Sequence, residues 1–346
     1  MQEMEHVLDD ADLDLVAALQ IAPRAPLNTV AEILGTSAST AGRRIQRLQQ
    51  LGLLRFIGTV HWSLITTGNP YVVWIKCRPG ATADVAAAIQ KVPQAQSLIS
   101  TTGDSDIYCT LYPLPGTDRR RLLGRTLPEI PGIASIQSHL VLRSAREAFT
   151  WRLDRLTARQ TQELRQQVDA LPAAAPTTVG PLNEFEFRTL QLLVEDSRIS
   201  AAQVARELDV SRSTAYRTIQ SLLESGAVRP RVEIEPAALG FPITALFTLD
   251  VQPRHIPAVL TALGEHPCAR FTVMTAGPAS ILHHGVFTDE DHLSRFVTDD
   301  LGALPGLNGV NTLIALSVLR RQWIDRDDDL VLGHRAHDIL SPTATD

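Results

Sequence analysis

The 346-residue chain has little of what marks several other classes of protein. It contains three cysteines, Cys77, Cys109 and Cys268, and no Cys-x-x-Cys pair. Because no spacing fits a zinc site, we expect buried, reduced thiols and no metal. No apolar run approaches the roughly 18 residues of a membrane helix, and the acidic stretch Met1–Asp14 lacks the basic and apolar regions of a signal peptide. These absences predict a cytoplasmic protein without a membrane partner.

The sequence also lacks the signatures of catalysis. It has no nucleophile–base–acid set, no phosphate-binding glycine loop and no pair of carboxylates at a catalytic spacing. His283 and His284 are adjacent on a predicted strand, so their side chains point to opposite faces and cannot chelate one metal. We therefore expect no catalytic residue, no metal and no cofactor, and a protein that is not an enzyme.

Positive charge is supplied almost entirely by arginine, because two of the 32 basic residues are lysines. The net charge is −6, but residues 1–173 carry 18 basic and 16 acidic side chains (+2), whereas residues 174–346 carry 14 and 22 (−8). A local basic face on an acidic protein favours site-specific binding of DNA over coating of bulk DNA. The stretch Ser37–His61 is such a face: it has no acid and contains Arg43, Arg44, Arg47 and Arg55.

The chain repeats itself at a shift of 174 residues (211 − 37). Ser37–Leu48 recurs as Ser211–Leu222, and residues 8–55 align with 182–229 without a gap at 16 identical pairs out of 48. Markers further along the chain, such as Gly103 with Gly277, keep the same shift. A unit of this length is a duplicated pair of domains and not a solenoid repeat.

Each copy begins with the element order of a winged helix-turn-helix. In copy one, Asp9 is a good N-cap for a first helix, a short helix is expected over 29–34, and Ser37 caps a longer helix that runs to about residue 51. Gly52 and Gly226 occupy the left-handed position that ends such a helix. The alternating stretch 55–61 predicts the strand of the wing. The two winged helix-turn-helix domains are placed at 1–62 and 182–236.

After Asn69 the apolar period changes. Strands are predicted over 70–78, 95–102, 106–112 and 133–142, with helices over 81–92 and 116–127. The order β-α-β-β-α-β is that of a ferredoxin-like sandwich, so the fold class is α+β. The two sandwich domains are placed at 69–144 and 243–320. The open face of each sheet needs a cover, which we expect to be the sheet of the other copy or of another chain.

Two further segments complete the chain. Residues 145–181 join the copies, first with helical spacing from Arg146 to Leu171 and then as a proline- and alanine-rich tether. The tail, 321–346, is acidic and is expected to be partly disordered.

The helix Ser37–Leu48 with Gly52, and the strand–loop–strand Thr102–Ile107, resemble the Lrp/AsnC (feast/famine) family of transcriptional regulators. The resemblance covers 8–142 and 182–316, as two tandem copies, whereas the family usually has one unit per chain. It implies a winged helix-turn-helix that binds double-stranded DNA and a ferredoxin-like domain that binds a small-molecule effector, an amino acid or a related metabolite. It also implies a homo-oligomer that forms through the effector domains.

The helices that follow the turn in each copy supply the candidate DNA contacts, because their first turns meet base edges and their flanks meet phosphates. Arg43 and its equivalent Arg217 are both retained, whereas Gly42 becomes Tyr216, so we expect the copies to read different half-sites. The alternative is a solvated arginine face whose serines act only as helix caps. The candidates are Ser37, Ser39, Thr40, Arg43, Arg44, Arg47, Ser211, Arg212, Ser213, Thr214, Tyr216 and Arg217.

A glycine- and aspartate-containing loop is the candidate effector site. Glycine lets a backbone approach a ligand closely, and an aspartate can hold an ammonium group; a plain hairpin turn is the alternative. Copy two has lost both acids, so we expect copy one alone to recognise an amine. The candidates are Thr101, Thr102, Gly103, Asp104, Asp106 and Gly277.

The interpretation is a sequence-specific transcriptional regulator whose assembly and DNA affinity respond to an effector. Two alternatives stay open. Some proteins that resemble this family are tetrapyrrole decarboxylases built from paired units, for which His139, His283 and His284 would be the suspects. The chain could also be an architectural DNA-binding protein without an effector.

Overall fold

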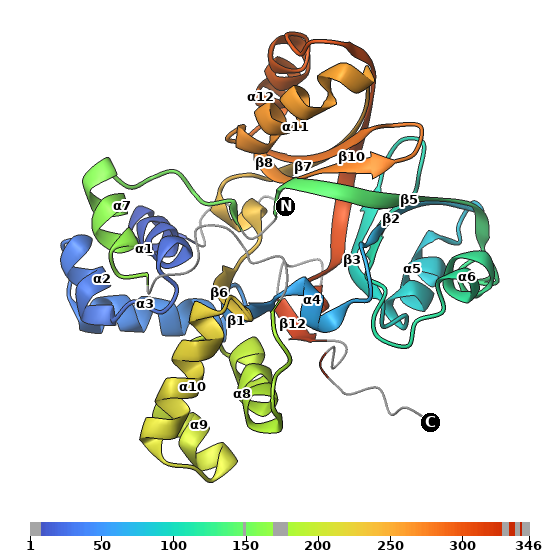
Figure 1. Ribbon diagram of the computed structural model, residues 1–346. Coiled ribbons are helices and arrows are strands. Elements are labelled where there is room, and N and C mark those ends of the chain that lie inside the picture. The colour runs from blue at the N-terminus through green and yellow to red at the C-terminus, as the bar shows by residue number, and fades with distance from the viewer. Residues whose placement is uncertain (1–7, 148–149, 169–178, 327–331, 336–339, 341–346) are drawn as a thin grey trace. The chain divides into compact units, whose positions relative to one another are not determined.

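The computed structural model describes residues 8–147, 150–168, 179–326, 332–335 and 340 (Figure 1). The chain forms two compact units: unit 1 is Met1–Ile65 with Arg152–Glu235, and unit 2 is Thr66–Trp151 with Pro236–Asp346. Unit 1 thus contains the helix-turn-helix domains of both copies, and unit 2 contains the sandwich domains of both copies. Among the described residues, no helix has the length and apolar character that crossing a bilayer requires.

Unit 1 consists of two winged helix-turn-helix domains and one extra helix. Copy one contributes α1 (Asp10–Ile21), α2 (Leu27–Ile33), α3 (Ala38–Gln50), β1 (Arg55–Val60) and α4 (Trp62–Ile65). Copy two contributes α8 (Glu184–Glu195), α9 (Ala201–Leu208), α10 (Arg212–Glu224) and β6 (Val228–Glu233), and the extra helix is α7 (Ala158–Arg165).

The sequence signals for these helices are confirmed. Asp9 caps α1 in a capping box with Asp12, and Ser37 caps α3 by accepting the Thr40 backbone N–H. Ala41, Ile45 and Leu48 of α3 are buried, as the helical spacing predicts. Gly52 and Gly226, with φ of 69° and 70°, hold the left-handed conformation that ends the two long helices.

The wing strands of the two copies pair with each other. β1 and β6 run antiparallel, with Arg55 opposite Glu233 and Thr59 opposite Arg229. Positions 229 and 233 are 55 and 59 shifted by 174, so the pairing is the one that a two-fold axis would produce. Ile57 faces its own equivalent, Arg231, and marks the centre. Unit 1 therefore has the internal pseudo-symmetry of a dimer of helix-turn-helix domains.

Unit 2 is built on one antiparallel sheet, with helices on its outer side (Figure 1). Its strands are β2 (Tyr71–Cys77), β3 (Ala95–Thr101), β4 (Ile107–Leu111), β5 (Ile133–Arg146), β7 (Ile243–Val251), β8 (Ala269–Ala276), β9 (Ile281–Phe287), β10 (Leu307–Arg321), β11 (Ile324–Arg326) and β12 (Leu332–Arg335). Its helical segments are α5 (Thr82–Gln90), α6 (Arg119–Arg121), η1 (Leu122–Thr126), η3 (Pro236–Leu239), η4 (Pro253–His255), α11 (Ile256–Glu265), α12 (Glu290–Arg295) and η5 (Phe296–Asp300).

The strand order confirms two ferredoxin-like halves joined edge to edge. The order within the first half is β3-β4-β2-β5, and that within the second half is β8-β9-β7-β10. β5 of the first half pairs with β8 of the second, and β10 of the second half pairs with β3 of the first, so the eight strands form a closed sheet. The two crossings have matching registers: Val141 pairs with Thr275, and Ala315, which is 141 shifted by 174, pairs with Thr101.

Closure explains a difference from the sequence prediction. We expected the last strand of copy one to end at Leu142, but β5 runs to Arg146 because its second half pairs with β8 of the other copy. The predicted cover of the open sheet face is confirmed, since residues of both halves share one inner cluster. This inner cluster contains Val72, Trp74, Ile99, Tyr108, Val141, Leu246, Val273, Leu282 and Leu313.

The joining segment and the tail differ from expectation. Of the helix predicted between Arg146 and Leu171, the described residues form the α-helix α7 and a 3₁₀ turn at Thr150, and 148–149 and 169–178 lie outside them. In the predicted tail, β11 and β12 extend the sheet beyond β10. Trp323 anchors this extension by donating its indole N–H to the Pro93 carbonyl at 2.8 Å. The rest of the tail, 327–331, 336–339 and 341–346, lies outside the described residues.

Candidate nucleic-acid interface and ligand pocket

The helix α3 presents several of its predicted DNA-contacting side chains outward. Arg43 and Ser39 are exposed, and Thr40 is partly exposed. The Ser37 hydroxyl accepts the backbone N–H of Thr40 and lies 2.9 Å from its hydroxyl, so it serves as the helix cap. A DNA contact by these residues stays a prediction, and Arg43 is an exposed cation that can make it.

The two other arginines of α3 are held by acids of α1. Arg44 Nη1 lies 2.8 Å from both Asp9 and Asp12 carboxylates, and Arg47 also pairs with Asp12. Asp12 is completely buried. The hydrogen bond from Arg44 lowers the pKa of Asp9, and the same bond raises the pKa of Arg44. This cluster joins α1 to α3, so Arg44 and Arg47 have a structural role besides the predicted one.

Copy two lacks this cluster of Asp9, Asp12, Arg44 and Arg47. The positions of Asp9, Arg44 and Arg47 are occupied there by Asn183, Thr218 and Ser221. The capping box is kept in copy two, where the Asn183 and Glu186 side chains accept each other's backbone N–H. The loss of Arg44 therefore accompanies the loss of one of its two partners, Asp9, which is a structural reason for this difference between the copies.

The second recognition helix, α10, keeps a different exposed surface. Its cap Ser211 lies 2.9 Å from the Ser213 hydroxyl and 2.8 Å from the Thr214 hydroxyl. Arg212 and Arg217 are exposed, and Tyr216 is 57% exposed although it is a large ring. An aromatic ring that is left in solvent at the start of α10 is available for contact with a partner.

The predicted effector loop is tied into a hairpin. The Thr101 hydroxyl donates to the Ser105 carbonyl. The Thr102 backbone N–H donates to the Ile314 carbonyl of β10, and the Ile314 N–H donates to the Thr102 hydroxyl. Asp106 accepts the Cys77 backbone N–H at 2.7 Å and lies 3.8 Å from Lys76 Nζ. Gly103 takes φ of 95°, which favours glycine, and Asp104 is exposed. Asp106 thus orders the hairpin in the structure, and a ligand contact there stays a prediction.

Gly277, the sixth predicted effector residue, lies against His139 of the other half. A Cβ added at Gly277 would meet the His139 ring at 2.7 Å. Burial lowers the pKa of His139. The glycine therefore permits a close packing between the halves at this position. At Gly103 an added Cβ would meet Leu313 only at 3.5 Å, and the φ of 95° is what favours glycine there.

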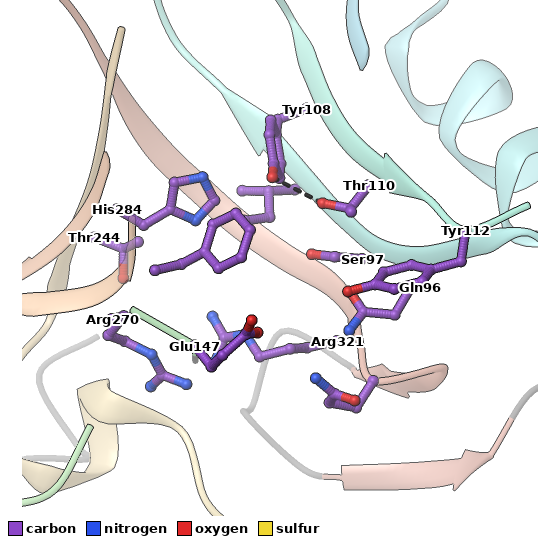
Figure 2. Close-up of a pocket in the computed structure, with 13 residues that line it drawn as sticks. Gln96, Ser97, Tyr108, Thr110, Tyr112, Glu147, Thr244, Arg270, His284 and Arg321 are labelled. Atoms are coloured by element: carbon purple, nitrogen blue, oxygen red, sulfur yellow. Dashed lines mark hydrogen bonds between the residues drawn. The ribbon is translucent and has the colours of Figure 1, made fainter. Parts of the chain in front are cut away.

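A pocket lies within unit 2, at the end of β3 opposite to the hairpin (Figure 2), and the empty space inside it and in the adjoining solvent is about 600 Å³. Figure 2 shows side chains of both halves pointing into it. None of the six predicted effector residues lines it. The lining residues are Gln96, Ser97, Ile99, Tyr108, Thr110, Tyr112, Glu147, Thr244, Arg270, Phe271, His284, Arg321 and Gln322.

The adjacent histidines of β9 separate as the sequence predicts. His283 packs on the helical side of the sheet, stacked on Phe296, with its Nδ1 2.9 Å from the Thr272 hydroxyl. His284 faces the pocket between Tyr108 and Phe271. Burial lowers the pKa of both, to about 3 for His283, and Arg321 and Arg270 contribute to the lowering at His284. His284 is therefore a neutral imidazole beside two cations.

Sequence reasoning missed the pocket residues other than His284. The signal was present, because the pocket positions of the two copies differ sharply in chemistry: Gln96 against Arg270, and Glu147 against Arg321.

Comparison with known proteins agrees with the geometry. Residues 8–49 match the AsnC-type helix-turn-helix domain, residues 71–150 and 244–323 both match the Lrp/AsnC ligand binding domain, and residues 181–238 match the sugar-specific transcriptional regulator TrmB. The matched segments coincide with the winged helix-turn-helix domains of unit 1 and the two halves of unit 2.

Similar proteins of known sequence are single-unit regulators. An uncharacterized HTH-type transcriptional regulator of Pyrococcus horikoshii is 27% identical over 143 residues, which is 41% of this chain and 89% of the relative. The HTH-type transcriptional regulator FL11 of Pyrococcus abyssi is 27% identical over 141 residues, covering 40% of this chain and 93% of the relative. Each relative spans less than half of this chain, as a single unit would.

A solved structure resembles nearly the whole chain. The siroheme decarboxylase NirDL superposes with a TM-score of 0.57 at 14% identity, over 90% of this chain and 93% of that one. At this identity the likeness concerns the fold. Both halves of unit 2 and the first helix-turn-helix match one family, and the second helix-turn-helix repeats the first. The chain therefore belongs to the Lrp/AsnC family of helix-turn-helix transcriptional regulators, as a tandem duplicate of the family's unit.

Proposed function

We propose that the chain is a sequence-specific DNA-binding regulator that is not an enzyme and whose two recognition helices act as a pair. The observation that supports this most directly is the pairing of β1 with β6, which relates α3 and α10 by the pseudo-two-fold of unit 1. Two-fold-related recognition helices suit two half-sites on one duplex. Arg43 and Arg217 occupy equivalent exposed positions on the two helices.

The operator of such a regulator is asymmetric. Equivalent positions differ, with the partly exposed Ala38 and Gly42 against the exposed Arg212 and Tyr216, so the halves present different groups to the two half-sites. A preference for one base pair over another is worth about 1–3 kcal/mol for a good bidentate contact. Selection from a random library is expected to return two unlike half-sites; recovery of perfect palindromes alone would contradict this.

The regulator responds to a small molecule bound by unit 2, an amino acid or a related metabolite. A ligand changes DNA affinity only by binding the DNA-competent state and the other state with different affinity. Assembly of whole chains through their effector domains is the second equilibrium that such a ligand can shift.

Fluorescence anisotropy on DNA from upstream of the protein's own gene tests the proposal, with scrambled DNA beside it and salt varied. Arg43→Ala and Arg217→Ala are expected to weaken specific binding and to lower the salt slope by about one each. Arg78→Ala, an exposed arginine of unit 2, is the matched control. Equal, weak binding to both DNAs, unchanged by either substitution, would contradict sequence-specific regulation.

A second candidate is a tetrapyrrole decarboxylase. It is favoured by one observation, the neutral His284 beside Arg270 and Arg321 in a fold that resembles siroheme decarboxylase NirDL. NirDL has also been solved with an iron-uroporphyrin III analogue. If the chain has this activity, adding iron-uroporphyrin III will change its visible absorption spectrum, and siroheme will lose CO₂ in a reaction that His284→Ala abolishes. We expect neither result.

A further inference from the structure

The pocket of unit 2 lies across the pseudo-two-fold axis that relates its halves. Eight of its thirteen lining residues form four pairs whose numbers differ by 174. In a homodimer each such position would present the same side chain twice. Here every pair differs: Gln96 with Arg270, Ser97 with Phe271, Thr110 with His284, and Glu147 with Arg321.

All the cationic and aromatic members of these pairs come from the second half. Arg270 is 5% exposed and Arg321 is 7% exposed, so both guanidinium groups are held in the wall of the pocket and not in bulk solvent. Arg270 is further positioned by the face of Trp151, 5.4 Å from its Cζ. A guanidinium fork in such a place is suited to bind a carboxylate.

The imidazole of His284 adds one polar group. Its Nε2 is out of contact with solvent and has no hydrogen-bond partner among the residues that the structure describes. A buried polar atom of this kind costs about 1–3 kcal/mol until it is satisfied. As a neutral ring, His284 can donate to a carbonyl oxygen or accept from a hydroxyl of a bound molecule.

The surroundings of His284 are apolar. The rings of Tyr108 and Phe271 lie edge-on to it, with centroids at 4.8 Å and 5.4 Å, and Ile99 also lines the pocket. The Tyr108 hydroxyl is engaged with Thr110 at 2.7 Å, which Figure 2 shows as a dashed line. These groups provide an aromatic surface next to the cationic one.

Charge balance selects the ligand class. Two arginines and Glu147, with His284 neutral, give the lining a formal charge of +1. A monoanion brings the formal charge of the lining to zero, whereas a zwitterionic amino acid does not change it.

We propose that this pocket binds a monoanionic organic acid with an apolar or aromatic body, its carboxylate on Arg270 and Arg321 and a neighbouring oxygen on His284. It is a site distinct from the hairpin loop of Thr101–Asp106. The proposal deepens the proposed function, because it gives the regulator's effector a place and a charge.

Isothermal titration calorimetry on the full chain tests the site. The probes are phenylpyruvate, 4-methyl-2-oxopentanoate and benzoate, with phenylalanine and leucine as zwitterions of matching bodies. We expect at least one monoanion to bind and to bind at least tenfold more tightly than its amino acid. Failure of all three acids at millimolar concentration, or tighter binding of the amino acids, overturns the proposal.

The duplication offers variants that the fold already accommodates. Arg270→Gln, His284→Thr and Arg321→Glu each introduce the residue that the other half uses at the equivalent position. We expect Arg270→Gln and Arg321→Glu to weaken acid binding at least tenfold and His284→Thr to weaken binding of the 2-oxo acids more than that of benzoate. Arg78→Gln, an exposed arginine of the same unit, is expected to change nothing, and circular dichroism verifies folding.

DNA binding is measured on the same samples and separates the two proposals. Binding of DNA without binding of any acid removes the pocket assignment and leaves the regulator. Binding of an acid that depends on Arg270 and Arg321, without binding of DNA, keeps the pocket and removes the regulator. If none of the three pocket variants changes the affinity for the acid, the ligand binds elsewhere and the assignment is overturned.

Discussion

Arg24 and Arg198 donate reciprocally between the two helix-turn-helix domains. Arg198 donates to the carbonyls of Pro23 and Ala25 at 2.8 and 3.0 Å, and Arg24 donates to those of Ser197 and Ile199. These two arginines are equivalents at the shift of 174, and so are the carbonyls that they reach. Arg198 also lies over the Phe56 ring, 5.0 Å from its centroid. The exchange fastens the domains independently of β1 and β6.

Replacement of Arg198 by Gln is expected to loosen this connection. It removes two charge-assisted bonds to backbone carbonyls, so the free energy of unfolding of unit 1 should fall by about 2 kcal/mol. DNA affinity should fall as well, although no recognition-helix residue is changed. Urea denaturation and anisotropy measure the two effects. Arg188→Gln, on the exposed side of α8, is the control; equal behaviour of the two variants would show that the exchange does not stabilise the pair.

Arg44 and Arg43 are adjacent, but their replacement should affect different properties. Arg44→Ala leaves the buried Asp12 carboxylate with one fewer partner, so we expect a loss of about 1–3 kcal/mol in unfolding free energy. Arg43→Ala should leave stability within about 0.5 kcal/mol and weaken DNA binding. Thermal unfolding and anisotropy on both variants distinguish the roles. A stable Arg44→Ala protein with weakened DNA binding would return Arg44 to the DNA interface.

Acid should destabilise unit 2 through His283. The folded state keeps its pKa at about 3, whereas the unfolded chain takes up a proton below the ordinary value of 6.5. Stability attributable to the neutral ring is therefore present above pH 6.5 and falls as the pH drops toward 3, by at most about 1.4 kcal/mol per pH unit. His283→Gln should lose about 2 kcal/mol less than the wild type between pH 7 and pH 5. Urea titrations at both values measure this, and identical losses would argue against it.

Gly277→Ala tests the packing between the halves of unit 2. The added methyl would overlap the His139 ring, so we expect a destabilisation of about 1–3 kcal/mol. Replacing His139 by Ala as well should recover part of the loss, since the collision is removed. A double-mutant cycle by chemical denaturation gives the coupling. A coupling energy of zero would show that Gly277 and His139 do not interact. Unchanged stability in Gly277→Ala would mean that packing does not require glycine there, and a role in ligand binding would again be the explanation.

Much of the architecture could be predicted because its signals are local. Ser37 and Ser211 cap helices, Gly52 and Gly226 end them, and the apolar period changes where the strands begin. These effects act within a few residues, so one sequence is sufficient to locate them. The shift of 174 extended each prediction to the second copy.

The relationships between the copies were harder to predict. The length of β5 depends on its pairing with β8, and the extension by β11 depends on Trp323 reaching Pro93. The role of Arg24 is a similar case: its retention as Arg198 was visible, but nothing local indicated that its partners belong to the other copy. The pocket was missed for the same reason, because Arg270 and Arg321 meet only when the sheet closes.

Covalent fusion removes one variable from the behaviour of unit 1. A pair of separate chains held by wing strands comes apart when it is diluted, so its occupancy of DNA depends on the square of its concentration. Here β1 and β6 belong to one polypeptide. The effective concentration of one strand near the other is therefore set by the chain that joins them and does not change on dilution. A few molecules in a cell therefore retain the paired arrangement, and occupancy by a single chain rises in simple proportion to its abundance.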